Sequence, residues 1–101
     1  MRQRRRFADV KLGDIVEFDG DAVAGADWAE RARLGVAAWA GCAHADLGRV
    51  LGPGTFARDG MQLTGRVYAR HLDGSRFVDV QVVGRDRDHI CASAIVRVAL
   101  A

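Results

Sequence analysis

The sequence contains no apolar run long enough to cross a membrane, and its arginine-rich start, MRQRRR, is not followed by the hydrophobic region of a secretory signal. These two absences argue against a membrane span and against secretion by that route. We therefore expect a cytoplasmic protein with no membrane partner.

Cysteine is scarce, and the two cysteines, Cys42 and Cys91, form no CxxC pair. Each is interpreted as a small buried thiol rather than a metal ligand or half of a disulfide. The sequence also lacks a Walker phosphate loop, a Rossmann glycine pattern, an HExxH helix and zinc-ligand spacing. No metal, nucleotide or other cofactor is expected.

The sequence also lacks a large excess of positive or negative charge, since its net charge is only +2. The basic residues gather in residues 1–6, whereas the other arginines are interleaved with acids, so nucleic acid is not expected as a partner. We interpret residues 1–6 as a flexible, solvated tail. Contact of this tail with phosphate, or with the acidic surface of a partner, is the alternative.

The sequence has enough apolar residues for one core, since 50% of its 101 residues are hydrophobic. A single domain over residues 7–101 is expected, and a domain of this size buries a smaller share of its surface than a large one. Oligomerisation would supplement that burial.

The first half predicts a strand followed by a helix. The run IVEF at residues 15–18 is typical of a strand. Asp27 and Glu30 suit the positive end of a helix beginning there, and apolar residues recur at three- and four-residue steps from Trp28 to Leu51.

Glycines punctuate this predicted helix. Gly35 is interpreted as a break, and Gly41 as a point where a sheet approaches closely. Gly52 is expected to form the left-handed cap that ends the helix, and Pro53 cannot continue it.

The second half predicts three strands. Residues 61–70 alternate between apolar and polar side chains, Asp73-Gly74 is a hairpin signal, and Val78, Val80 and Val82 share one face of the next strand. The last strand, residues 90–100, again has alternate apolar positions. An antiparallel meander covered by one helix is an α+β fold.

This order of elements is that of a hot-dog domain, in which a curved antiparallel sheet wraps around one long central helix. Four segments resemble, in that order, segments of the MaoC-like (R)-hydratases and dehydratases: FADVKLGDIVEF, GADWAERARLG, LGPGT and residues 60–100. The resemblance implies binding of an acyl thioester of coenzyme A or of an acyl carrier protein, and a lyase activity that adds or removes water.

The active members carry an Asp and a His on a loop of the form Gly-Asp-x-Asn-Pro-x-His, because water must be deprotonated while a proton reaches the neighbouring carbon. Here only Gly35 lies between Leu34 and Val36, and an alignment on Gly20-Asp21 places Ala26 where the His would stand. The resemblance therefore implies a reduced protein without the usual dyad, and whether it is an enzyme stays open.

Two residues are candidates for nonstandard catalysis: Asp27 at the helix start, and His44. Each also has an ordinary interpretation, Asp27 as a helix cap and His44 as a polar position on the helix, with a role in a pocket at a subunit interface as the alternative for His44. Trp28, Trp39 and Gly35 are candidates for the acyl-binding site, although tryptophan at helical spacing is commonly part of a core. His71 and His89 are interpreted as solvated residues at turns.

A homodimer, or a hetero-oligomer with another hot-dog subunit, is expected because free sheet edges can join. The alternative function is a non-catalytic structural or partner subunit of such an oligomer. Arg66, Arg70 and Arg76 are expected to face water, with contact to the phosphates of a ligand as the alternative.

Overall fold

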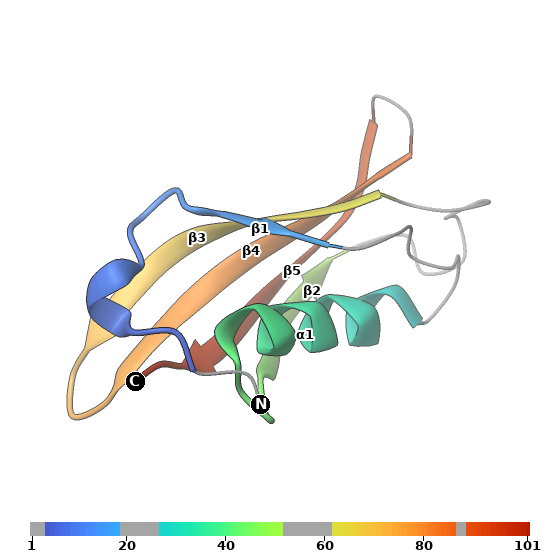
Figure 1. The fold of residues 1–101 in the computed structure, drawn as a ribbon. Coiled ribbons are helices and arrows are strands. Elements are labelled where there is room, and N and C mark those ends of the chain that lie inside the picture. Colours follow the sequence, from blue (N-terminus) through green and yellow to red (C-terminus); the bar gives the residue numbers. More distant parts are fainter. Residues whose placement is uncertain (1–3, 19–26, 52–61, 87–88) are drawn as a thin grey trace.

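A computed structural model of the chain describes residues 4–18, 27–51, 62–86 and 89–101, without the side chains of Asp27, Asp86, His89 and Cys91. Its elements are a 3-10 turn η1 (Phe7–Asp9), β1 (Ile15–Glu17), α1 (Asp27–Ala40), β2 (Asp46–Leu51), β3 (Gln62–Leu72), β4 (Arg76–Asp86) and β5 (His89–Ala99) (Figure 1).

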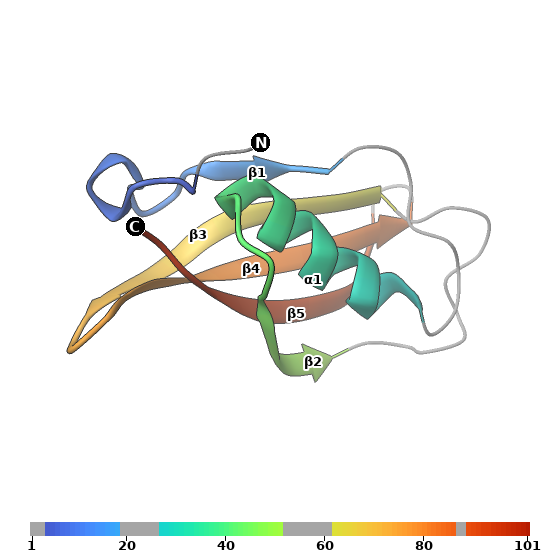
Figure 2. The same cartoon turned by 60° about the horizontal axis from the view of Figure 1, so that its bottom comes forward.

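The five strands form one antiparallel sheet in the order β1-β3-β4-β5-β2. The predicted meander of β3, β4 and β5 is confirmed, and the early strand β1 adds to its outer side. Helix α1 lies across one face of the sheet, between the edge strands β1 and β2 (Figure 2). The α+β fold class is therefore confirmed, with two layers.

Alternation along the strands builds the core as the sequence predicts. The residues that point toward α1 are almost fully buried: Val16, Leu63, Val67, Val78, Val80, Val82, Ala92, Ala94, Val96 and Val98. Ile90, expected on the same face, is 59% exposed, because the pairing of β4 with β5 shifts between Gly84 and Arg85.

Helix α1 buries one face only. Trp28, Ala32, Val36 and Ala40 follow one another at four-residue steps, and all are buried against the sheet. The opposite face carries Glu30, Leu34 and Ala38, which are exposed. The helix is thus covered from one side.

The helix ends at Ala40, so the predicted helix over residues 28–51 is wrong in its second half. Gly41 has a positive φ of 73°, its N–H donates to Ala38 O at 3.1 Å, and the N–H of Cys42 donates to Ala37 O at 2.9 Å. These two bonds with a left-handed glycine form a Schellman cap, which satisfies the last carbonyls. The cap expected at Gly52-Pro53 lies outside the described residues.

Residues 46–51, assigned to the helix by the sequence, form the edge strand β2. Leu47 and Val50 pair with Val96 and Ala94 of β5, whose side chains are buried, although a regular strand puts residues three apart on opposite faces. Leu47 is half-buried against the core, whereas Val50 stays 45% exposed at the edge of the sheet. A register shift between them restores the match. Because of this irregular pairing, the apolar spacing of the strand imitates that of a helix.

The N-terminal segment is attached to the domain at Arg5. The Arg5 N–H donates to Ala40 O at 2.8 Å, and the Arg5 carbonyl accepts from the N–H of Ala101 at 3.0 Å. Part of the segment that the sequence assigns to a tail is therefore held between the helix end and the C-terminal residues. Among the described residues, no helix has the length and apolar character needed to cross a membrane.

Candidate functional site

The candidate site is a groove between α1 and β1, and its floor is the ring of Phe18. This ring lies between two glycines. A Cβ built on Gly35 would overlap Cε2 and Cδ2 of Phe18, and one built on Gly65 would lie 3.2 Å from its Cε1. Two backbones that carry no side chain at these points therefore hold the ring from both sides.

The structure exchanges the roles that the sequence assigns to Gly35 and Gly41. The helix continues through Gly35, which permits close approach of β1, whereas Gly41 ends the helix. Both glycine interpretations are corrected. The reason is tertiary, because the sequence does not show that the Phe18 ring needs the space above residue 35.

The groove has a volume of about 730 Å³ and is open to solvent. Its lining combines apolar residues with charged residues: Arg5, Asp14, Ile15, Glu17, Phe18, Arg31, Leu34, Gly35, Ala38 and Trp39. The volume lies within the range of roughly 300–1,000 Å³ typical of small-molecule sites. An apolar chain can lie on the floor while polar groups meet the charged margin.

Arg5 forms one end of this margin and is fixed in place. Its guanidinium lies over the Trp39 ring, 4.8 Å from the centroid, and its Nε donates to Trp39 O at 2.6 Å. A cation stacked in this way keeps its charge accessible while its position is restrained.

Two of the three predicted ligand-binding residues, Gly35 and Trp39, lie in the groove. Trp28 is only 3% exposed and belongs to the core. Sequence reasoning missed Phe18 and Arg5, which are remote in the chain. The only local signal was an aromatic residue at the end of a short strand.

The structure does not bring the two predicted catalytic residues together. Asp27 is the first residue of α1, and its side chain lies outside the described atoms. His44, which the sequence places on the helix, is exposed in the connection between α1 and β2. The 14 residues of α1 span about 20 Å at 1.5 Å per residue, and His44 follows the opposite end of the helix from Asp27. His44 does not line the groove.

A different acid and histidine do meet, on the face of the sheet turned away from α1. His71 Nε2 lies 3.0 Å from Asp79 Oδ2, and Asp79 also accepts two bonds from Arg97, at 2.8 and 3.1 Å. Phe77 completes the cluster, with the His71 ring stacked on it at 4.6 Å and the Arg97 guanidinium over it at 4.3 Å.

This cluster has the character of a structural network. Asp79 is only 7% exposed. Hydrogen bonds from Arg97 and then from His71 lower the pKa of its carboxyl group, despite the opposing effect of burial. A carboxylate held ionised by a bidentate arginine is a weak proton acceptor, so we assign Asp79 to stability.

The pairing of strands brings His71, Asp79 and Arg97 together, and this depends on one irregularity in the register of β3. The register of β3 with β4 shifts between Val67 and Ala69, which turns His71 to the outer face. The same shift turns Arg70 toward η1, where it donates to Phe7 O at 3.1 Å. His71 is therefore a bonded strand residue, and its interpretation as a solvated turn residue is corrected.

No group of three or more potential metal ligands occurs within the described parts of the chain. Comparison of the sequence and structure with protein-family models, with curated proteins and with solved structures finds no match.

Proposed function

We propose that this chain is a hot-dog protein that binds an acyl thioester in the groove between α1 and β1, without the catalytic dyad of the MaoC-like hydratases. The order strand, helix, four strands, with the helix held between edge strands β1 and β2, supports the fold. The observation that carries the function is the apolar floor, made by Phe18 between Gly35 and Gly65.

The groove suits the two parts of such a ligand. Phe18, Leu34 and Ala38 offer an apolar surface to an acyl chain. The polar thioester arm would lie along the margin that contains Arg5 and Asp14. Binding without turnover is supported by the engagement of Asp79 by Arg97, which keeps this carboxylate from acting as a base.

Isothermal titration with octanoyl-pantetheine tests this function. Leu34 is 53% exposed, so Leu34→Glu puts a charge beside the acyl chain with little cost to folding. We expect a loss of affinity of roughly tenfold or more, because a carboxylate in contact with an apolar chain must lose its hydration.

Leu72→Glu is the matched control, since Leu72 is 71% exposed and does not line the groove. Equal affinity of both variants for octanoyl-pantetheine, or no binding by the unmodified protein, would contradict the proposal. Hydration of an octenoyl-pantetheine by the protein would show instead that it is a catalytic hydratase.

A second candidate function is that of a partner subunit in a hot-dog oligomer. The specific observation is the edge strand β2, which among the described strands pairs with β5 alone and exposes Val50 and Leu51. An unpaired edge with exposed apolar residues favours addition of another strand.

A further inference from the structure

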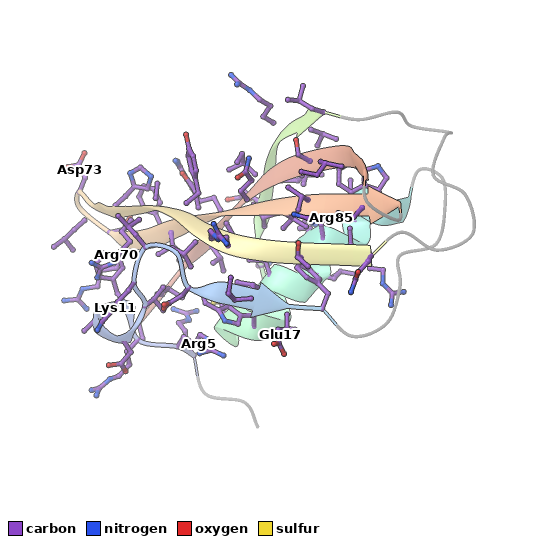
Figure 3. The ribbon with its side chains drawn as sticks, turned by 90° about the horizontal axis from the view of Figure 1, so that it is seen from above. Arg5, Lys11, Glu17, Arg70, Asp73 and Arg85 are labelled. Carbon is purple, nitrogen blue, oxygen red and sulfur yellow. The ribbon has the colours of Figure 1, made fainter. Side chains whose placement is uncertain are left out.

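One end of the molecule carries a concentration of positive charge, which we call the basic end and define as Arg4, Arg5, Arg6, Lys11 and Arg70. All five residues are exposed. Figure 3 shows Arg5, Lys11 and Arg70 at the same end of the molecule, together with Asp73, whereas Arg85 of β4 lies farther along the sheet.

The basic end is built by the fold and is not a simple run of charge. Arg5 is held by hydrogen bonds of its main chain and by the stack of its side chain on Trp39. Arg70, from β3, lies over the Phe7 ring at 4.3 Å and donates to the Phe7 carbonyl. Cations from separate segments are thus held at one surface, with their charge accessible to a partner.

The charge is local. Five cations of the basic end stand near three carboxylates, Asp9, Asp14 and Asp73, the last of which Figure 3 shows at the same end. Because the whole chain has a net charge of +2, the remainder of the chain has as many acids as bases. A partner that approaches this end of the molecule therefore meets a positive electrostatic potential.

The basic end adjoins the groove, because Arg5 belongs to both and Asp14, which accepts from the N–H of Lys11 at 2.8 Å, also lines the groove. A ligand lying in the groove with a bulky anionic carrier attached would place that carrier over the basic end. Leu12, which is 64% exposed beside Lys11, adds an apolar contact of the kind found in protein interfaces.

We propose that the basic end is a docking surface for an acidic acyl carrier domain, which delivers the acyl chain to the groove. This inference rests on the proposed function and selects a protein carrier over free coenzyme A. The cations are spread over a broad end of the molecule, and the guanidinium groups of Arg5 and Arg70 already stack on Trp39 and Phe7. This arrangement suits an extended acidic surface, whereas a compact phosphate is bound by side chains and amides that converge.

The test measures binding of an octanoyl-loaded acyl carrier protein of fatty-acid synthesis, its unloaded apo form, and octanoyl-pantetheine. The variant Arg6→Glu/Lys11→Glu reverses two exposed cations of the basic end. The control, Arg66→Glu/Arg85→Glu, makes the same change in net charge on the outer face of the sheet, where both arginines are exposed. Thermal unfolding establishes that each variant is folded.

We expect the basic-end variant to lose roughly tenfold or more in affinity for the loaded carrier, and the affinity of the unmodified protein to fall with added salt. The control variant should lose less than about threefold. The affinity of all three proteins for octanoyl-pantetheine should agree, because that ligand lacks the acidic domain.

Three outcomes overturn the inference. Equal losses in the two variants would show a general effect of net charge. Failure of the loaded carrier to bind, while octanoyl-pantetheine binds, would refute the docking surface and leave the proposed function standing. Binding of a short single-stranded DNA through Arg6 and Lys11, with no binding of either carrier form, would assign the surface to nucleic acid. If octanoyl-pantetheine fails to bind but the apo carrier binds through the basic end, the proposed function fails and the surface stands.

Discussion

At the scale of single residues, the contact of Phe18 with Gly35 joins β1 to α1 and forms the floor of the groove. Sequence reasoning identified Gly35 as a candidate of the binding site but expected the helix to break there. The ring occupies the position that any side chain at residue 35 would need.

Gly35→Ala should therefore destabilise the protein. Alanine favours a helix by about 1 kcal/mol relative to glycine. The overlap with the Phe18 ring should cost more, about 1–3 kcal/mol, as other overpacked sites do. We expect a net loss in the free energy of unfolding, measured by urea denaturation.

The double variant Phe18→Leu/Gly35→Ala provides the control, because a smaller side chain at residue 18 leaves room for the methyl group. The two changes should be less than additive. A gain in stability for Gly35→Ala alone would show that the ring does not constrain the helix.

At the scale of elements, Asp79 connects three strands of the sheet. It lies directly opposite Arg97 of β5 in the register and is bonded to His71 of β3. The sequence shows Asp79 and Arg97 as polar positions in strands, and His71 as a polar residue beside a turn. Only the pairing of the strands, including the shift in β3, shows that they meet.

Stability should depend on the ionisation of Asp79. The folded protein lowers its carboxyl pKa, so the stabilisation is fully present above the ordinary pKa of aspartate, about 3.9, and is lost as the pH falls through the folded value. Asp79→Asn should cost about 1–3 kcal/mol near neutral pH. The difference from the unmodified protein should shrink in strongly acidic solution.

Urea denaturation of both proteins across the acidic range measures this difference. Asp73→Asn, at the exposed tip of the β3–β4 hairpin, is the matched control and should change stability by less than about 0.5 kcal/mol. If the free energy of unfolding of the unmodified protein and that of Asp79→Asn changed with pH in parallel, Asp79 would not be the group that causes the loss of stability in acid.

The pattern of apolar residues at 41–51 explains why the sequence predicts a helix where the structure has a turn and the strand β2. A helix and an irregular edge strand both place apolar residues at a spacing of three, so the pattern alone did not distinguish them. The glycine at residue 41 was the available signal, because a left-handed residue after an apolar helix is a common stop.

At the scale of the whole molecule, two layers leave much apolar surface uncovered. The outer face of α1 exposes Leu34, and β2 exposes Val50 and Leu51. We propose that two copies join through their β2 edges, which would extend the sheet and cover part of this surface.

Sedimentation equilibrium should then give twice the chain mass of 10.9 kDa. Val50→Lys should shift the protein to the monomer, because lysine on an edge strand opposes strand addition. Leu72→Lys replaces another exposed residue, 71% exposed, in β3, which β4 and β5 separate from β2, and should leave the dimer intact. A monomeric unmodified protein, or a dimer insensitive to Val50→Lys, would contradict joining through β2.

The sequence by itself determined the α+β class, the three-stranded meander, the start of the helix and most inward-facing residues of the meander strands. These follow from local periods of two and 3.6 residues, which depend only on the backbone and on the burial of apolar side chains. The end of the helix, the strand β2, the Phe18 floor and the His71–Asp79–Arg97 cluster were decided by tertiary structure. Each depends on which residues, remote in the chain, become neighbours in space. Strand register and close backbone contacts set those neighbours, and a local sequence pattern does not encode them.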